Sequence, residues 1–334
     1  MEGKTIYYFT KEYATLYTIV EKDVIFMATS SFLSADGITP IHYHAWLPDA
    51  TPRAVLVIFH GMLEYSTRYE EFARFLNHHD IAVFAQDHLG HGNSCTSPAQ
   101  RGHFGDTNGN SNVIHDCQEM VSIANEEYPG LPLFLLGHSM GSFLLRQLLH
   151  QCELPALAGV LLMGTGQMPE NVIRLGRNIA KGVATVRGPA YKSKLLYKLL
   201  LGSNNKRIRE HHSKSDWLSR DHVRVDAYDG NPMIIDNFTA KAYSDMLSGM
   251  LTNYDGHRLS ALDTSIPLIL LSGDADPIGS YGKGIEKLYQ QYEALGYEDL
   301  SLKLYPGARH ELLNETNRGE VMNDILAWLE NHIR

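Results

Sequence analysis

Residues 133–150 read Leu-Phe-Leu-Leu-Gly-His-Ser-Met-Gly-Ser-Phe-Leu-Leu-Arg-Gln-Leu-Leu-His. An apolar run short enough for a buried strand ends at Gly137, and apolar residues at helical spacing follow Gly141. Between them lies Gly137-x-Ser139-x-Gly141, the Gly-x-Ser-x-Gly pattern at a sharp strand-to-helix turn. Glycines let neighbouring backbone pass closely while the serine takes a strained conformation. The stretch therefore predicts an exposed nucleophilic serine at the end of a strand.

Apolar runs and helical patterns alternate on both sides of this turn. The expected strands are 54–59, 81–85, 133–136, 157–163, 266–271 and 300–305, and the expected helices are 69–77, 113–127, 281–295 and 320–332. Residues 32–46 alternate around Asp36-Gly37, which predicts a hairpin. Because the later strands are continuously apolar and joined by helices, we expect an α/β fold with a mostly parallel central sheet and helices on both faces.

The alternation stops between residues 166 and 265. Helical stretches at 173–183 and 191–201 replace it, and Pro and Gly occur together at 188–189 and 230–232. We expect residues 1–165 and 266–334 to form the core. Residues 166–265 are expected to form an inserted helical cap above the ends of the strands.

The cap region differs from the rest of the chain in charge. The whole chain has a net charge of −9, which argues against nucleic acid as a partner. Residues 171–214, however, contain eleven basic residues and one acidic residue, Glu210. Three interpretations stay open: a solvated basic face, a surface that contacts anionic phospholipid, or direct contact with an anionic substrate group. Residues 192–198, whose lysines are interleaved with Leu195, Leu196 and Leu199, have the pattern of an interfacial helix.

The cellular compartment is predicted from what the sequence lacks. No apolar run reaches the roughly 18–20 residues that cross a bilayer, and the first residues do not resemble a signal peptide. Cys95, Cys117 and Cys152 match neither a disulfide framework nor a zinc site. We therefore expect a cytoplasmic enzyme without a metal.

A serine hydroxyl needs a base to take its proton, and that base needs a carboxylate to fix its tautomer. Asp274 and Asp276 follow the strand at 266–271, and His310 follows the strand at 300–305. We favour Asp276 because the following proline favours an extended or turning backbone that can project the side chain. Other candidate histidines are His88, His91, His103, His211 and His212. The order Ser139, Asp276, His310 is that of an α/β-hydrolase triad.

Acyl transfer also needs two backbone amides that stabilise the developing oxyanion. One is expected from Met140, directly after Ser139 and at the start of a helix. The other is expected from Met62, in the loop after the strand at 54–59. Since only their amides are needed for this purpose, both thioethers are expected to line an apolar acyl channel.

Four segments resemble one family. His60–Tyr69 is similar to the His-Gly-x-x-Glu-x-Ser-x-Arg-Tyr motif of the monoglyceride lipase and lysophospholipase branch of the α/β-hydrolases, a branch similar to serine aminopeptidase S33. Asp87–Ser94 is similar to its Asp-x-x-Gly-x-Gly-x-Ser segment, Gly137–Gly141 matches the monoglyceride lipase elbow, and Tyr305–His310 resembles its histidine loop. Together the motifs lie in 54–165 and 266–334.

The resemblance implies a cofactor-free serine hydrolase acting on a small lipid ester, a monoacylglycerol or a lysophospholipid. By this resemblance Ser139 is the nucleophile, Asp276 the acid and His310 the base, with Met62 and Met140 as oxyanion donors.

Glu64 and Arg68 match polar residues that support the oxyanion loop and approach the leaving alcohol. We favour the simpler interpretation, a partly buried ion pair that holds this loop.

The substrate stays open at this point. Gln100–His103 resembles a segment of bacterial lysophospholipases, whereas the insertion departs from both relatives. Alternatives are a carboxylesterase, a thioesterase or an aminopeptidase of the same fold, or a binding protein without catalysis. An aminopeptidase would need an acidic cluster in the cap to hold the substrate amine, and this cap is basic.

Overall fold

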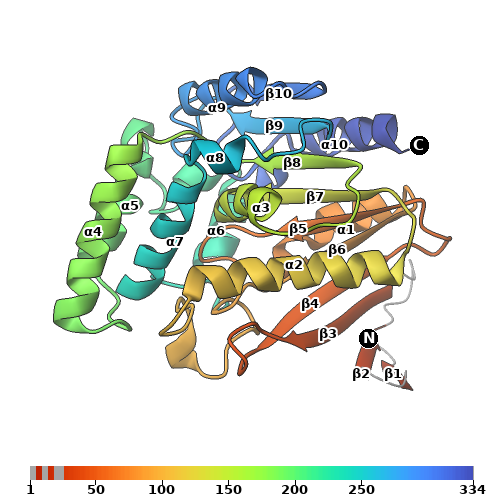
Figure 1. Cartoon of the computed structure of the whole chain (residues 1–334), viewed down its shortest axis with the longest axis horizontal. Helices are drawn as coiled ribbons and strands as arrows, with labels where there is room; N and C mark the ends of the chain where they lie inside the picture. The colour runs from red at the N-terminus through yellow and green to blue at the C-terminus, as the bar shows by residue number, and fades with distance from the viewer. Residues whose placement is uncertain (1–4, 10–13, 19–25, 334) are drawn as a thin grey trace.

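The computed structural model describes residues 5–9, 14–18 and 26–333. These residues form one ten-stranded sheet in the order β1-β2-β3-β4-β6-β5-β7-β8-β9-β10 (Figure 1). The strands are β1 Thr5–Phe9, β2 Ala14–Thr18, β3 Phe26–Leu33, β4 Pro40–Leu47, β5 Ala54–Phe59, β6 Ile81–Gln86, β7 Leu133–His138, β8 Gly159–Met163, β9 Leu268–Gly273 and β10 Leu300–Tyr305. In the order of the sheet, the pairs from β1 through β4 to β6 are antiparallel. Every pair after that, from β6 with β5 to β9 with β10, is parallel.

Helices cover both faces of the sheet, as the sequence predicts. The α-helices are α1 Glu70–Asn77, α2 Gly109–Glu127, α3 Met140–Gln151, α4 Glu170–Arg187, α5 Lys194–Leu200, α6 His222–Asp229, α7 Ala240–Thr252, α8 Gly256–Leu259, α9 Lys283–Ala294 and α10 Arg318–His332. Short 3₁₀ helices are η1 Ser66–Tyr69, η2 Pro98–Gln100, η3 Asn204–Arg207, η4 Asp216–Leu218 and η5 Leu312–Asn314. Alternate residues of β5 pack on opposite sides: Val57 with α2, α3 and α9, and Leu56 with α1 and α10.

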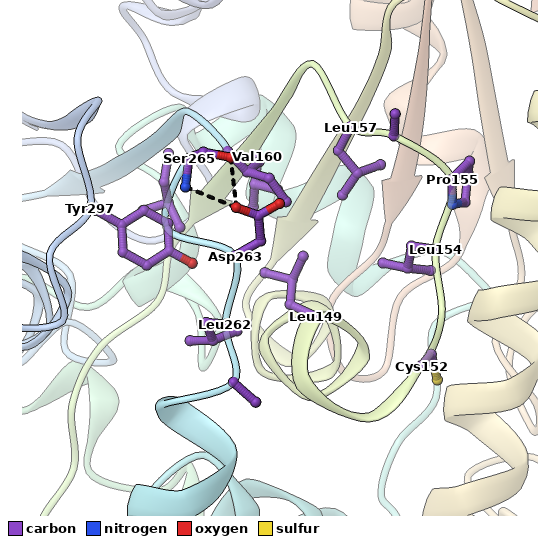
Figure 2. A pocket seen from close by; sticks show the side chains of 14 residues that line it. Leu149, Cys152, Leu154, Pro155, Leu157, Val160, Leu262, Asp263, Ser265 and Tyr297 are labelled. Carbon is purple, nitrogen blue, oxygen red and sulfur yellow. Dashed lines mark hydrogen bonds between the residues drawn. The ribbon is translucent and has the colours of Figure 1, made fainter.

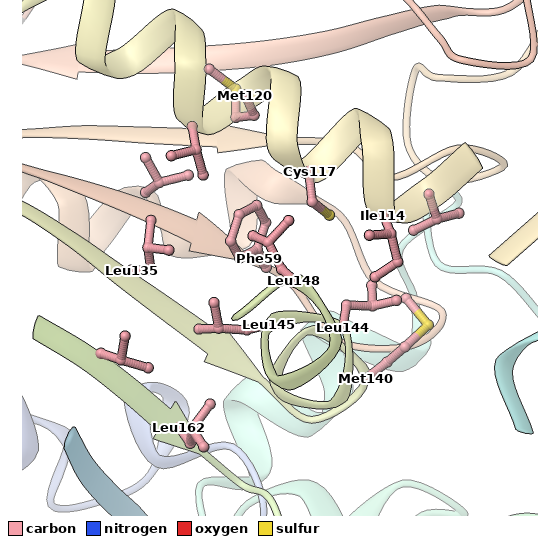
Figure 3. Packing of buried hydrophobic residues seen from close by; sticks show 14 of the residues in the cluster. Phe59, Ile114, Cys117, Met120, Leu135, Met140, Leu144, Leu145, Leu148 and Leu162 are labelled. Atoms are coloured by element: carbon pink, nitrogen blue, oxygen red, sulfur yellow. The ribbon is translucent and has the colours of Figure 1, made fainter. Parts of the chain in front are cut away.

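Helix α3 is held tightly between the sheet and α2. Figure 3 shows Leu145 and Leu148 of α3 together with Phe59 and Leu135 of the strands and Cys117 of α2, all buried. Burying each large apolar side chain contributes about 1.5–3 kcal/mol. The first turn of α3, which follows Ser139, is therefore fixed relative to the strand ends.

In the chain, the inserted helices follow β8 and precede β9, and these two strands are neighbours in the sheet. β8 and β9 are paired in parallel, with Val160 opposite Leu268, so the chain leaves the sheet after β8 and returns beside it. In the intervening segment α4 packs on α7, and Ile173, Leu247 and Met250 contact Phe143 of α3. Figure 1 shows α4, α5 and α7 gathered at one end of the sheet. None of the helices in the described residues has the length and apolar composition of a bilayer-spanning segment.

Some element boundaries differ from the sequence expectation. β7 continues to His138, so the turn begins at Ser139 itself. α9 begins at Lys283 rather than at 281. The physical reason lies in the preceding backbone, where Ser280 and Tyr281 have φ values of 51° and 57°, outside the right-handed helical region.

One surface pocket lies far from the strand ends that carry Ser139. It has a volume of about 410 Å³ and is lined by Val160 and Leu268, at the amino ends of β8 and β9, and by Leu149 of α3 (Figure 2). Its carboxylate, Asp263, already accepts hydrogen bonds from the Ser265 amide and hydroxyl at 3.0 and 2.6 Å. The pocket therefore combines apolar side chains with a carboxylate whose hydrogen bonds are made within its own loop.

Candidate functional site

Ser139 occupies the sharp turn between β7 and α3. Its backbone has φ 53° and ψ −117°, a conformation that non-glycine residues rarely adopt. A Cβ atom at Gly137 would lie 2.6 Å from the Gly141 carbonyl, and one at Gly141 would lie 2.0 Å from the Phe59 carbonyl. Both flanking positions therefore require glycine. The strained turn predicted from the Gly-x-Ser-x-Gly pattern is present.

The structure brings His310 and Asp276 together. The His310 Nδ1 atom lies 2.9 Å from Asp276 Oδ2, and both side chains are almost fully buried. The second Asp276 oxygen accepts a hydrogen bond from the Ile278 amide at 2.8 Å. The indole of Trp217 lies against the imidazole of His310, with ring centroids 4.9 Å apart. A carboxylate that accepts from Nδ1 leaves Nε2 as the basic nitrogen.

The competing acid lies elsewhere. Asp274 is exposed, and its Oδ1 accepts a hydrogen bond from the Gly307 amide at 2.6 Å. The competing histidines also have other surroundings. His88 and His91 are buried beside His60, and burial lowers the pKa of His91 to about 3. His91 is therefore neutral at physiological pH, and its role is to pack against its neighbours.

The loop after β5 lies against Ser139. A Cβ atom at Gly61 would be 3.2 Å from the Ser139 Cβ, and the Gly61 amide donates to Glu64 Oε1 at 2.6 Å. Neither the Met62 amide nor the Met140 amide donates a hydrogen bond to any described residue. Both expected donors are therefore available to a ligand beside the serine.

Glu64 and Arg68 form the expected ion pair, with 2.6 Å between Oε2 and Nη1, and it is part of a larger network. Arg68 also forms a bidentate pair with Glu311, with both distances 2.6 Å. Glu64 Oε1 accepts from the Tyr69 hydroxyl at 2.9 Å and lies 3.0 Å from His138 Nδ1. All of these groups are buried or nearly so. The network fixes the loop of Met62 to the loop of His310.

The charges of this network stabilise one another. Burial acts to raise the pKa of Glu64, but Arg68 and the hydrogen bond with His138 outweigh it and hold that pKa well below its usual value. Burial acts in the opposite sense on His138, yet its contact with Glu64 leaves the His138 pKa raised. Glu64 is therefore ionised at neutral pH, and it favours a proton on His138.

A pocket of about 110 Å³ opens at Ser139 and His310. Most of its wall is apolar and flexible, with five methionines: Met62, Met140, Met168, Met246 and Met250. Met62 and Met140, whose thioethers are expected to line an acyl channel, both belong to this lining. Glu64, His138 and Glu311 contribute a polar end. The pocket at Ser139 thus has an apolar wall and a charged end.

Sequence reasoning did not identify Glu311, His138 or Trp217 as parts of this site. His138 stands next to the serine in the elbow and Glu311 next to His310, so adjacency was an available signal for both. Trp217 comes from the inserted segment, and no local pattern marks its contact with His310.

Comparison with known proteins identifies the family. The family model of serine aminopeptidase S33 (Hydrolase_4) matches residues 50–317. The chain belongs to this family. It is 32% identical over 289 residues to the human monoglyceride lipase, covering 85% of this chain and 84% of that protein. It is also 29% identical over 306 residues to a monoacylglycerol lipase of Mycolicibacterium smegmatis, covering 91% and 97%.

Solved structures agree with the α/β-hydrolase fold. A thermostable carboxyl esterase from Bacillus coagulans, solved with glycerol, superposes with a TM-score of 0.84 at 26% identity, over 92% of this chain and 99% of that one. A soluble variant of the monoglyceride lipase of Saccharomyces cerevisiae superposes with a TM-score of 0.70 at 21% identity, over 88% and 92%. The predicted fold and family are confirmed, and the protein is an S33-family serine hydrolase.

Proposed function

We propose that this S33-family protein hydrolyses carboxylic esters of lipids, monoacylglycerols or lysophospholipids, through an acyl-enzyme. The observation that carries the proposal is the pocket at Ser139, which joins a methionine-rich wall to a charged end. An ester with an acyl chain and a polar alcohol has the same two-sided character. Relatives named monoglyceride and monoacylglycerol lipase support this substrate class.

In the proposed mechanism His310 accepts the Ser139 proton while the hydroxyl oxygen attacks the ester carbonyl. Asp276, 2.9 Å from His310 Nδ1, holds the ring in the required tautomer and stabilises the imidazolium. The alcohol leaves with the proton from His310. Water then attacks the acyl-enzyme by the same steps and releases the fatty acid.

The oxyanion would be stabilised by the amides of Met62 and Met140. Both are free of other hydrogen bonds among the described residues, and the start of α3 adds its dipole. Because Glu64 accepts from the Gly61 amide, the loop conformation is fixed before substrate binds. Such preorganised donors need no reorganisation during the reaction.

We assign the leaving alcohol to the polar end of the pocket. Glu64, His138 and Glu311 reach the pocket wall, and Arg68 lies behind them. The carboxylates can accept hydrogen bonds from the hydroxyls of glycerol, and the imidazole can donate or accept one. Glu64 and Arg68 then have two roles, as an ion pair that holds the loop and as part of the alcohol subsite.

A carboxylesterase with a non-lipid substrate is the second candidate, favoured by the likeness to the Bacillus coagulans esterase. A thioesterase would use the same machinery. An aminopeptidase has less support, because the carboxylates of Glu64 and Glu311 are both paired with Arg68 and the segment 171–214 is basic. Catalysis is favoured over simple binding because strain at Ser139 is retained beside a buried His–Asp pair.

One substrate panel separates these candidates. Wild type and Ser139→Ala are assayed with monoacylglycerols of graded chain length, lysophospholipids, short aryl esters, thioesters and aminoacyl amides. We expect kcat/KM to be highest for a lipid monoester and to rise with chain length until the methionine-lined pocket is filled. Short aryl esters preferred over every lipid would favour the carboxylesterase. Labelling by a fluorophosphonate probe that Ser139→Ala abolishes would separate catalysis from binding.

We further propose that residues 166–265 act as a cap whose outer surface contacts anionic membrane. On α4 and α5, Leu175, Leu195 and Leu199 are exposed among basic side chains. Apolar and basic residues combined on one helical face suit the interface of an acidic bilayer. Free thiols at all three cysteines suit the reducing cytoplasm, where we propose the enzyme acts.

A further inference from the structure

A further pocket shares Trp217 with the pocket at Ser139. It has a volume of about 700 Å³ and is lined by residues of the cap together with the loops that follow β9 and β10. Four arginines contribute to its wall, and they come from three parts of the chain: Arg207, Arg209, Arg220 and Arg309. We call this the arginine pocket. Its lining includes two carboxylates, Glu210 and Asp274.

Two of the arginines are held rigidly by the fold. Arg309 donates from Nη1 to the backbone carbonyls of Asp216 and Ser219, at 2.6 and 2.8 Å. Arg220 pairs with the buried carboxylate of Glu315 at 2.8 Å. Burial lowers the pKa of Arg309, the nearby carboxylates of Glu315 and Asp216 act to raise it, and the charge of Arg220 acts to lower it. Both guanidinium groups therefore hold fixed positions on the pocket wall.

The other two arginines are exposed and less constrained. Arg207 lies over the ring of Tyr281, with its guanidinium carbon 3.6 Å from the ring centroid. Arg209 forms no hydrogen bond or ion pair with any described residue. Neither Arg207 nor Arg309 has a carboxylate partner within 4.0 Å among the described residues. The wall therefore carries four arginines against two carboxylates, so positive charge is in excess, and one of the two carboxylates, Asp274, already accepts a hydrogen bond from the Gly307 amide.

The floor of the arginine pocket is formed by the loops of the proposed acid and base. Ala275 of the floor precedes Asp276 directly, and Arg309 precedes His310 directly. Trp217 lines both this pocket and the pocket at Ser139, and its ring contacts that of His310. A ligand bound here would contact the loops that carry Asp276 and His310 without entering the pocket at Ser139.

We propose that the arginine pocket binds a phosphate group, either free or as part of a lipid head group. Guanidinium groups that approach from several segments suit a tetrahedral anion with several acceptor oxygens better than a planar carboxylate with two. The site is separate from the proposed ester site, so it does not depend on the substrate assigned there.

The test compares two double variants of equal charge change. Arg207→Ala/Arg209→Ala removes the two arginines that hold no backbone group. Arg177→Ala/Arg187→Ala is the control on α4, where Arg187 lies over Tyr191 at 4.4 Å, much as Arg207 lies over Tyr281. Inorganic phosphate is titrated by calorimetry and by thermal shift, at constant ionic strength against chloride. Losing two charge-assisted contacts should weaken phosphate binding by at least about tenfold, with the control near wild type.

Vesicles identify the source of the phosphate. Binding to phosphatidylcholine vesicles is measured with and without phosphatidic acid for wild type and Arg207→Ala/Arg209→Ala. The control for this assay is Lys283→Ala/Lys287→Ala on α9, outside the α4 and α5 surface proposed to contact membrane. If Arg207→Ala/Arg209→Ala specifically loses binding of inorganic phosphate, the ligand is free phosphate. If it loses only binding to vesicles that contain phosphatidic acid, the ligand is a lipid head group.

The proposal is overturned if wild type binds neither inorganic phosphate nor phosphatidic acid vesicles. It is also overturned if, in the assay where wild type binds, Arg207→Ala/Arg209→Ala and the control variant of that assay lose binding equally. The single variant Arg209→Ala, which removes no contact of the fold, must show part of the same loss.

Discussion

The loops at the strand ends and the inserted helices hold their charges in opposite ways. At the strand ends Glu64, Arg68, Glu311 and the His310–Asp276 pair are buried, and each has a partner within 3 Å. On α4 and α5 the basic side chains are mostly exposed and interleaved with exposed leucines. The first region holds its charges in a fixed geometry, whereas the second leaves them exposed to solvent.

This difference sets the size of the effects that substitutions should have. Removing one member of a buried pair leaves its partner unpaired and costs about 3–5 kcal/mol of stability. Removing an exposed charge usually changes stability by less than about 0.5 kcal/mol. Variants at the strand ends should therefore alter rate and stability together. Variants on the cap should alter binding to large or charged partners and leave the chemical step unchanged.

The largest effect is expected for Ser139→Ala. Loss of the nucleophile should lower kcat by about 10⁵–10⁶-fold, because no acyl-enzyme can form. Initial rates with a soluble aryl ester measure the loss, and circular dichroism checks that the fold is retained. Wild-type turnover in this variant would refute the assignment of the elbow as the catalytic site.

Asp276→Asn should have the next largest effect. The amide cannot fix the His310 tautomer as the carboxylate does, so kcat should fall by about 10³–10⁴-fold. Asp274→Asn is the matched control, since its exposed carboxylate lies two residues away and contacts the Gly307 amide instead. Equal losses in the two variants would contradict the choice of Asp276 as the acid.

Local patterns made much of this architecture predictable. A continuous apolar run such as Ala54–Phe59 predicts a strand that is buried on both faces. β5 is indeed buried at every residue. The turn at Ser139 was predictable because only glycine fits at Gly137 and Gly141. Pro277 correctly favoured Asp276 over Asp274 as the neighbour of His310, since it restricts the backbone at that residue.

Contacts between distant segments were not predictable from one sequence. Arg68 and Glu311 lie 243 residues apart, and their bidentate pair depends on how the β5 and β10 loops meet. The arginine pocket likewise depends on the cap lying over the loops after β9 and β10. The excess of basic residues in 171–214 was visible, but which of them converge on one pocket is a property of the fold.

Glu311→Gln tests whether the buried network positions the site. The variant keeps the shape but removes one charge from the bidentate pair with Arg68, so the free energy of unfolding should fall by about 1.5–3 kcal/mol. We expect kcat/KM for a monoacylglycerol to fall about tenfold as the alcohol end loosens. Urea denaturation and steady-state kinetics measure the two effects. The surface variant Glu71→Gln, whose partners Arg224 and Arg318 are partly exposed, should lose less than about 1 kcal/mol. Equal loss of stability in Glu311→Gln and Glu71→Gln would contradict the distinction between buried and exposed ion pairs.

The smallest effect on chemistry is expected for Lys194→Ala/Lys198→Ala on α5. The exposed lysines lie one turn apart, and each should contribute about 1 kcal/mol to binding an acidic membrane. Association with anionic vesicles should therefore weaken about thirtyfold and depend on salt, while turnover of a soluble ester stays at the wild-type rate.

Lys283→Ala/Lys287→Ala is a close control, because these lysines have the same spacing and the same position at the start of α9. If both pairs weaken vesicle binding equally, net charge alone accounts for the attraction, and the cap has no special role. If binding is insensitive to salt, the exposed leucines carry it and the basic residues form only a solvated face.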